Sequence, residues 1–566
     1  MKISIYFNPQ INWIKCPNGL IFQWLRINDD KILLKLLLVC TLISGQSRVE
    51  YPYDWSGEFG SISHDGRLFW NTDWTSGPLL FDGTYTFYPK RFGENISSKF
   101  SIFDAAEFSF NDSIFVDTSF VKTILDYKRG DYNYDQLSLD MYFRRPGRII
   151  GIHGFKRSYA GRQGQFFHPG GFQIPLQQSY RLDYDSKFRD WQVNASAARL
   201  ITESGLPDSS ENGLYKDEIL AAGLRTISPE TYLKWTSHLA LFQQWRRVDA
   251  LWYPNPDSQF IHRVKWGNQF KISGMELTMG LDVNAQSIGG GDTTLRQISW
   301  FTPYGKLNWY GIGASLGQTH FSNGSFTPYL SVLYSKKLLN MVITSHYTDN
   351  SHPTHIFLWE EKNQNLIERV ADGGWAIEMK FDQANAAVRY HRGFNEINNI
   401  NQGNYTSVEL SGELQLKKIL EISGSYAIQT GENYVFDGVR NRLKFQVDYC
   451  QNQFLDRFDL SASFKGEGLL NRAQSNLLSP IDGIPSRYSD SSVNLSDIWL
   501  LHFDVSATIS TMTFTWSVRN ILQAVEPTAL QMIPNTESGD FLVQYQSIFP
   551  PIGRLIMVGI YWTFQD

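Results

Sequence analysis

Charged residues and cysteines are both scarce in this chain. Only 19% of its 566 residues are charged, below the roughly 25% usual for soluble domains. The 51 basic and 56 acidic residues nearly balance at a net charge of −5, so no basic field for nucleic acid is present. Of the three cysteines (Cys16, Cys40 and Cys450), two precede or lie within the targeting segment described below. Too few thiols remain for a disulfide framework, a zinc–thiolate site or an iron–sulfur cluster.

Long apolar runs are missing as well, whereas aromatic residues are abundant. The mean hydropathy of −0.30 excludes a bundle of membrane helices. Aromatic residues make up 15% of the chain, with 17 Trp, 28 Tyr and 38 Phe, and glycine contributes 44 residues. A chain that is rich in aromatics, poor in charge and still hydrophilic on average is typical of a large β-barrel with one wet face and one lipid-facing face.

The N-terminal region contains an export signal. A basic segment begins at Lys31 and is followed by a short apolar core over 36–43 and by small residues at Gly45 and Ser47. The apolar core is too short to span about 30 Å of hydrocarbon as a helix, so we interpret 31–47 as a cleaved signal peptide. A buried helix and a lipid-anchored Cys40 are the alternatives. Residues 1–30 are then explained by a start codon assigned too far upstream.

From about residue 112 onward the apolar residues recur with period 2, which predicts β-strands. Residues 407–416 place Val, Leu, Gly, Leu and Leu on one face and Ser, Glu, Ser, Glu and Gln on the other, and 420–429 continue this pattern after a tight turn. These runs of about 10–15 residues are long enough to cross a bilayer when tilted. About 22 strands are predicted, beginning near residues 113, 134, 147, 179, 190, 216, 230, 258, 275, 295, 310, 326, 338, 367, 384, 405, 419, 440, 455, 497, 512 and 554.

The connections between these strands alternate between short and long. Short turns are expected at Pro146–Gly147, Arg189–Asp190, Lys336–Lys337 and Lys417–Lys418, among others. All long loops fall at the other end of the strands, as in outer-membrane barrels with tight periplasmic turns and long external loops. The long loops are expected at 160–177, 205–215, 250–257, 351–366, 398–404, 432–439, 469–496 and 523–553.

The last strand, from Arg554 to Asp566, is the most specific single segment. It places five apolar residues on one face and ends close to an aromatic residue, which resembles the signal that outer-membrane barrels present to their assembly machinery. We therefore expect the barrel assembly machinery and the outer-membrane bilayer to be partners of the chain. The residues expected to form this signal are Ile556, Val558, Ile560, Trp562 and Phe564.

The C-terminal 55 residues resemble the end of TonB-dependent receptors. The segment 514–522 contains an Arg-Asn-Ile-Leu sequence, and a Pro-Ile-Gly-Arg turn precedes the closing strand. The resemblance implies a 22-stranded barrel, an N-terminal plug and coupling to a TonB-type energising protein. Only residues 48–111 are available for a plug, and no TonB box follows Ser47, so a short or degenerate plug and passive passage stay open as alternatives.

Candidate ligand-binding residues lie in the predicted external loops. Exposed apolar clusters of this kind often mark a ligand or partner surface, although they also occur in the aromatic girdle of a barrel. No catalytic motif is recognisable, the eleven histidines are scattered, and neither a cofactor nor a metal site is assigned. The loop candidates are Phe166, Phe167, His168, Trp252, Tyr253 and Trp359, and the inward polar residues expected to set the charge of the lumen are Glu409, Glu413, Glu421, Asp448 and Lys444.

Together these patterns predict an all-β transmembrane antiparallel up-and-down barrel over 112–566, preceded by a periplasmic, plug-like segment over 48–111. The expected location is the outer membrane of a Gram-negative cell, and the expected function is passage or uptake of an unknown small solute rather than bond chemistry. Two alternatives stay open: a passive porin-like channel without a plug, and a non-transporting surface barrel that binds a partner through its loops.

Overall fold

The structure is a computed structural model, and its described residues are nearly all in strands. Among these residues, no helix is long and apolar enough to cross a membrane. Of residues 61–64 and 67–70, only the backbone is described. The described ranges are 61–64, 67–70, 119–158, 176–205, 214–229, 232–249, 259–272, 277–290, 293–353, 367–397, 400–416, 419–431, 439–454, 458–474, 493–494, 496–522 and 554–565.

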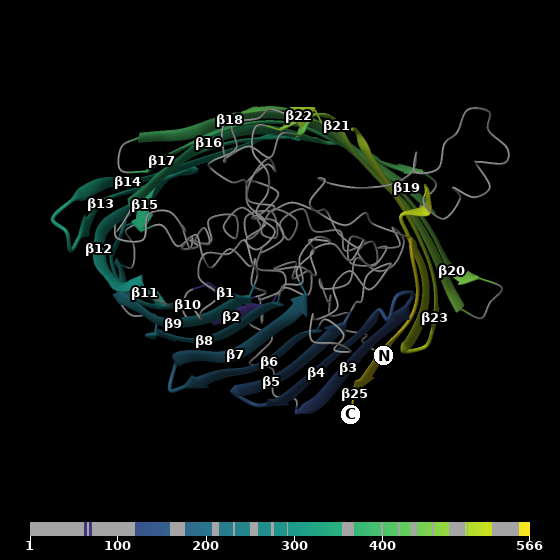
Figure 1. Cartoon of the computed structure of the whole chain (residues 1–566), viewed down its shortest axis with the longest axis horizontal. Coiled ribbons are helices and arrows are strands. Elements are labelled where there is room, and N and C mark those ends of the chain that lie inside the picture. The colour runs from purple at the N-terminus through teal and green to yellow at the C-terminus, as the bar shows by residue number, and fades with distance from the viewer. Residues whose placement is uncertain are drawn as a thin grey trace.

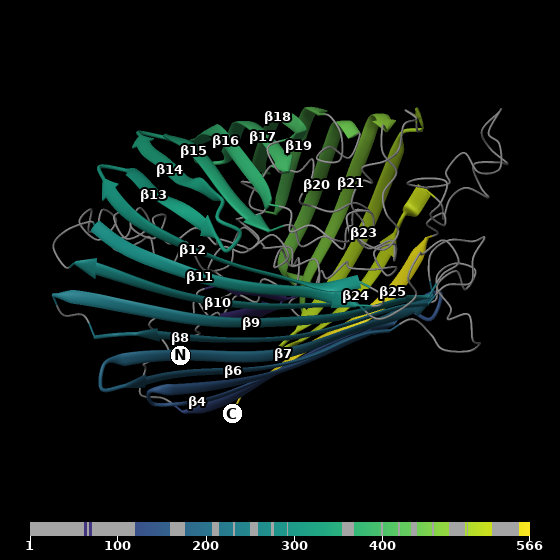
Figure 2. The same cartoon turned by 60° about the vertical axis from the view of Figure 1, so that its left-hand side comes forward.

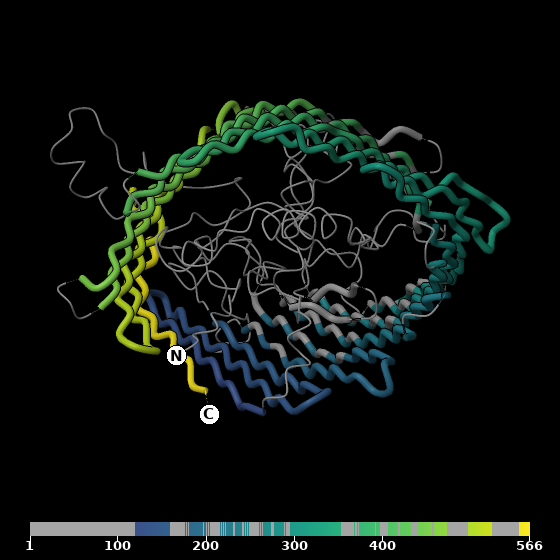
Figure 3. The backbone as a smooth tube through the Cα atoms, turned by 180° about the vertical axis from the view of Figure 1, so that it is seen from behind, coloured from purple at the N-terminus to yellow at the C-terminus, as the bar shows by residue number. Residues whose placement is uncertain are grey.

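Twenty-two antiparallel strands form a closed barrel of oval cross-section (Figure 1). Each strand pairs with the next strand in sequence, and the last strand, β25, pairs with the first, β3, to close the wall (Figure 3). A two-residue strand, β22 (Val493–Asn494), pairs with the end of β21. The strands are tilted relative to one another around the wall (Figure 2).

The bounds of the barrel strands are β3 (Phe120–Gly130), β4 (Asp135–Arg145), β5 (Arg148–Ser158), β6 (Leu176–Phe188), β7 (Trp191–Gly205), β8 (Leu214–Ile227), β9 (Leu233–Asp249), β10 (Gln259–Ile272), β11 (Leu277–Gly290), β12 (Thr293–Trp309), β13 (Ile312–Phe321), β14 (Phe326–Leu338), β15 (Met341–Pro353), β16 (Ile367–Lys380), β17 (Ala384–Ile397), β18 (Ile400–Leu416), β19 (Leu420–Gly431), β20 (Val439–Phe454), β21 (Phe458–Gln474), β23 (Ile498–Ile509), β24 (Met512–Arg519) and β25 (Leu555–Gln565). The predicted strand number and the all-β antiparallel barrel class are confirmed.

The two faces of the wall follow directly from the period-2 pattern. On β18 and β19 the register pairs Leu410 with Tyr426 and Leu414 with Ile422, and these apolar side chains are 37–52% exposed on the outer face. The intervening polar residues, such as Ser411 and Ser425, lie opposite each other on the inner face. Because a strand side chain alternates between faces, the sequence alone determines which residues contact lipid and which face the lumen.

Aromatic side chains gather near the short-turn end of the outer face. Trp191 and Trp235 contact each other edge to face with ring centroids 5.8 Å apart, and Trp309 and Tyr310 do the same at 5.2 Å. Trp309 and Tyr310 are 62% and 87% exposed. Exposed aromatic residues at the edge of an apolar band are typical of the interfacial girdle of a membrane barrel.

The turns at this end of the barrel are tight. Arg189 and Asp190, which connect β6 and β7, both have positive φ values of 47° and 67°. Gly311, after β12, has a φ of 85°, and a Cβ atom there would lie 2.5 Å from the Ser335 carbonyl oxygen. Two-residue turns with positive φ match the twist of antiparallel strands, which explains why they suit the short connections.

All long connections lie at the opposite end, as the sequence predicts, but four short ones (131–134, 291–292, 322–325 and 398–399) occur there too. The prediction of a long loop at 398–404 is wrong, because β18 begins at Ile400 and only residues 398–399 separate it from β17. Residues 400–404 lack apolar alternation, yet they extend β18 by pairing with β17 across an irregularity at Asn395 and Glu396. The first strand also begins later than expected, at Phe120 rather than near residue 113.

Candidate functional site

The inner wall formed by β16 to β23 carries a groove with a volume of about 640 Å³. Its lining residues include Ala387, Ser411, Ser423 and Ser425 on β17, β18 and β19, whose small side chains leave space next to the wall. Charged and amide side chains line the rest of the groove: Glu378, Lys380, Asn385, Arg389, Glu413, Lys444, Gln446, Lys465 and Glu467.

Strand register explains why these residues come together. Across the wall, Asn385 lies opposite Glu413, which lies opposite Ser423 on the next strand. The same row continues through Gln446 and Lys465 to His502 on β23. Each strand contributes an inward-facing residue at this level, so residues far apart in sequence form one continuous polar surface.

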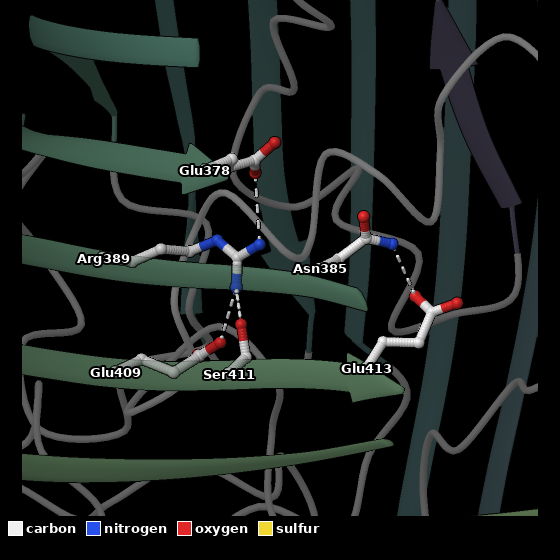
Figure 4. Close-up of polar contacts among 6 residues, drawn as sticks. All are labelled: Glu378, Asn385, Arg389, Glu409, Ser411 and Glu413. Carbon is white, nitrogen blue, oxygen red and sulfur yellow. Dashed lines mark hydrogen bonds and ion pairs between the residues drawn. The ribbon is translucent and has the colours of Figure 1, made fainter. Parts of the chain in front are cut away.

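Arg389 organises one side of the groove (Figure 4). Its guanidinium group donates to Glu409 at 2.9 Å and to the Ser411 hydroxyl at 2.8 Å, and it contacts Glu378 at 3.2 Å. One arginine on β17 thereby connects β16, β17 and β18. The geometry uses several donors of a planar guanidinium group, which a lysine ammonium cannot reproduce.

Glu413 lies near this cluster and has a different environment. Its carboxylate accepts a hydrogen bond of 3.3 Å from the Asn385 amide (Figure 4). Asn385 carries no charge, and within the described part of the chain no cation forms an ion pair with Glu413. The carboxylate is exposed to the lumen, so it can accept further hydrogen bonds from a solute.

The other side of the groove contains basic residues. The Lys444 ammonium group lies 4.0 Å from a Glu467 carboxylate oxygen, and the Lys444 side chain is 47% exposed. Lys465 lies on the neighbouring strand, opposite His502. Further along β23, Asp504 accepts a 2.9 Å hydrogen bond from Arg519 of β24. Both sides of the groove therefore carry both signs of charge, and the exposed groups that lie apart are Glu413 on β18 and Lys444 on β20.

A buried polar cluster lies on the inner face of β4, β5 and β6. His153 on β5 donates from Nδ1 to Asp140 of β4 at 2.7 Å, and its Nε2 lies 3.0 Å from Asp183 of β6. The Asp183 carboxylate also pairs with Arg181 at 3.0 Å. All four side chains are at most 7% exposed. Buried charges of this kind are tolerated only when they are paired, and these four pair with one another.

A second polar cluster lies further around the wall, on β9 to β11. His238 on β9 lies across Gly267 of β10, and its Nε2 is 4.0 Å from Asp282 of β11. The Lys265 ammonium group lies 3.4 Å from the same carboxylate. Between the two clusters, Asn194 of β7 donates to Asp185 of β6 and accepts a 3.0 Å hydrogen bond from Arg225 of β8. Polar contacts on the inner wall thus connect β4 to β8, and a separate set connects β9 to β11.

A short hairpin lies inside the barrel on this same side. It consists of β1 (Ser61–His64) and β2 (Arg67–Trp70), and β2 contacts β7 and β8 (Figure 1). The hairpin and the groove therefore lie on different parts of the wall: the hairpin contacts β7 and β8, and the groove lies on β16–β23.

The predicted inward residues lie where the sequence places them. Glu413 and Lys444 line the groove, and Glu409 binds Arg389 beside it. Glu421 and Asp448 lie opposite each other on the lumen side of β19 and β20, between the groove and the short-turn end of the barrel. The six loop candidates, Phe166, Phe167, His168, Trp252, Tyr253 and Trp359, lie outside the described residues, so a binding role for them stays a prediction.

Several site residues were not singled out from the sequence. The only sequence signal for them was their inward position on an alternating strand, which is shared by Arg389, Asn385, His153 and Asp183. Their partners come from neighbouring strands, and period-2 alternation does not give the register between strands. No group of three or more His, Cys, Asp or Glu side chains in the described ranges is arranged to hold a metal ion.

The five residues of the predicted assembly signal share the outer face of β25. Register pairs Val558 with Trp516 and Ile560 with Phe514, and Val558 is 57% exposed. Trp562 and Phe564 contact each other with ring centroids 3.9 Å apart. Ile556 occupies the same face opposite Val518. These positions put an apolar surface on the strand that closes the barrel.

No family model and no curated protein matches the sequence. Solved structures nevertheless match the fold. The FrpB iron transporter of Neisseria meningitidis aligns with a TM-score of 0.59 at 10% identity, over 79% of this chain and 83% of that chain. The copper transporter OprC aligns with a TM-score of 0.58 at 12% identity, over 79% and 80% of the two chains. The ferric preacinetobactin receptor BauA of Acinetobacter baumannii aligns with a TM-score of 0.53 at 11% identity, over 79% and 80%.

These structures share a fold with the chain rather than a recognisable sequence. The barrel has the fold of TonB-dependent receptors, as the C-terminal resemblance implies. The similar proteins are named as transporters and receptors.

Proposed function

We propose that the protein is an outer-membrane barrel that mediates passage or uptake of a polar solute, in the manner of TonB-dependent receptors. The observation that carries this proposal is the asymmetry of the lumen. Buried polar clusters and the β1–β2 hairpin occupy one part of the wall, and the groove on β16–β23 leaves a polar surface on another part. Support for a membrane location comes from the exposed apolar outer face and its aromatic girdle.

The proposal includes the elements expected from the sequence. Residues 31–47 act as the export signal, 48–111 act as a reduced plug to which the hairpin belongs, and the outer face of β25 is read by the assembly machinery. A barrel of 22 strands is too wide for wall side chains to fill, so a segment inside the lumen is needed to prevent free leakage. The shared fold with TonB-dependent receptors supports coupling of this segment to a TonB-type energising protein, whereas the lack of a TonB box after Ser47 argues against it.

A passive porin-like channel is the second candidate, and the groove itself favours it because it provides a continuous polar surface without any moving part. Single-channel conductance of the refolded protein in a planar bilayer separates the two candidates, after a heat-dependent gel shift confirms a folded barrel. A folded and inserted protein without conductance supports gated uptake. Large and stable conductance steps support the porin-like channel, and a missing gel shift contradicts both.

A further inference from the structure

We propose that the groove on β16–β23 is a binding site for a short zwitterionic peptide, with the peptide ammonium group at Glu413 and its carboxylate at Lys444. This inference rests on the proposed function and names the class of solute that the groove accepts. It follows from three features of the groove: the signs of its charges, their separation, and the small size of the side chains between them.

The charges of the groove have both signs and nearly cancel. Glu378, Glu413 and Glu467 supply carboxylates, and Lys380, Arg389, Lys444 and Lys465 supply cations, with Glu409 pairing Arg389 from beside the groove. A wall with charges of one sign concentrates ions of the opposite sign. A wall on which one carboxylate and one ammonium group lie apart, as Glu413 and Lys444 do, instead orients a solute that carries both signs itself.

The separation of Glu413 and Lys444 fits a short peptide. Glu413 lies on β18, and Lys444 lies two strands away on β20 and one inward position further along. Neighbouring strands are about 4.8 Å apart and each residue advances about 3.3 Å, so the two backbone positions are roughly 12 Å apart. An extended chain covers at most about 3.3–3.6 Å per residue, so two to four residues span the groove.

The side chains between these two residues are small and polar. Ser423 and Ser425 of β19 face the lumen between β18 and β20, and Ser411 lies opposite Ser425. Hydroxyl groups both donate and accept hydrogen bonds, so they match the amide groups of a peptide backbone. Of Phe, Tyr and Trp, only Phe445 is among the described lining residues, and its strand position faces outward. The groove therefore offers no inward ring of these types on which a flat aromatic ligand stacks.

Isothermal titration of the refolded full chain in detergent tests this site. The probes are triglycine, N-acetyl-triglycine and triglycine amide, which remove the positive or the negative end charge one at a time. Because each blocked terminus loses a charge-assisted hydrogen bond, we expect each modification to weaken binding by about tenfold. Equal affinities for the three peptides, or no binding of triglycine, overturn the proposal.

Two variants assign each end of the peptide. In Glu413→Gln, the difference between triglycine and N-acetyl-triglycine is expected to vanish while the difference from triglycine amide remains. In Lys444→Gln, the difference between triglycine and triglycine amide is expected to vanish, while the difference from N-acetyl-triglycine remains. Lys128→Gln is the matched control, because Lys128 also faces the lumen but pairs with Asp126 on β3, away from the groove. A control that changes peptide selectivity as strongly as the two groove variants contradicts the assignment.

The two proposals fail in different ways. A chain that does not form a heat-modifiable barrel in the outer membrane contradicts the proposed function. A correctly inserted barrel that does not distinguish the three peptides contradicts only the peptide site. The wild-type titration does not depend on any variant, so the test remains decisive even where a substitution prevents folding.

Discussion

His153 on β5 and Asp140 on β4 form a 2.7 Å hydrogen bond on the inner wall, and both side chains are at most 7% exposed. Asp183 approaches the other side of the imidazole ring, so this single histidine separates two buried carboxylates. The arrangement connects three consecutive strands on the inner face of the wall.

Replacing His153 with leucine is expected to destabilise the barrel by about 3–5 kcal/mol, because it leaves Asp140 and Asp183 buried and facing each other. The midpoint of urea unfolding in detergent micelles, followed by the heat-dependent gel shift, measures the loss. Adding Asp140→Asn to the leucine variant removes one of the two like charges and should restore part of the stability. An unfolding midpoint equal to that of the wild type in the single variant contradicts a structural role for the pair.

Gly267 is expected to reject any side chain. A Cβ atom there would lie 2.1 Å from His238 Cε1 and 2.5 Å from an Asp282 carboxylate oxygen. Gly267→Ala therefore forces His238 out of its buried position, at a cost of about 1–3 kcal/mol. Gly305→Ala is the matched control, since no atom lies within 4 Å of the added carbon. Thermal unfolding of both variants checks the prediction, and equal losses would show that the contact with His238 is not the cause.

The assignment of side chains to the outer and inner faces can be tested by placing an arginine on each face in turn. Leu410 is 52% exposed on the outer face, and Ser425, on the adjacent strand, faces the lumen. Leu410→Arg places a charge in lipid and is expected to cost about 2–4 kcal/mol, whereas Ser425→Arg reaches water and should cost little. Unfolding in lipid vesicles gives both values. If the serine variant is the less stable of the two, the assignment of the faces is wrong.

The outer face of the closing strand, β25, is expected to be needed for assembly of the barrel. Trp562 and Phe564 contribute apolar area to the outer face of β25, where they contact each other. Trp562→Ala or Phe564→Ala removes this area, which is worth about 2–3 kcal/mol per side chain, and should lower the amount of heat-modifiable barrel in the outer membrane. Thr563→Ala, at the alternate position between them, is the control. Amounts matching the wild type in both aromatic variants count against an assembly signal on this face.

The sequence predicts the barrel well because one rule governs every strand. Alternation of apolar and polar residues assigns Leu410 to lipid and Glu413 to the lumen without knowledge of any neighbour. The contacts of the site depend instead on register, which each turn sets separately. Glu378 and Glu409 meet at Arg389 only because β16, β17 and β18 are aligned at one level. The same limit explains the error at 398–404, where pairing with β17 extends a strand that has no alternating pattern.

Arg389 compensates the negative charges of two carboxylates at the groove. Its guanidinium group neutralises Glu378 and Glu409, with its side chain 24% exposed. Arg389→Ala leaves both carboxylates near Glu413 without their shared cation, and the loss is expected to be about 1–2 kcal/mol. Arg389→Lys keeps the charge but not the planar donors, so it should recover only part of this loss.

Salt distinguishes this electrostatic effect from a loss of packing. At 1 M salt the Debye length falls to about 3 Å, so repulsion among the remaining carboxylates is screened and the alanine variant should approach the wild type. Urea unfolding at low and high salt provides the comparison. Adding Glu409→Gln to Arg389→Ala should produce a similar recovery at low salt, because it removes one of the unpaired charges. A deficit that is unchanged by salt and by the second substitution would mean that Arg389 acts through packing of its alkyl chain rather than through its charge.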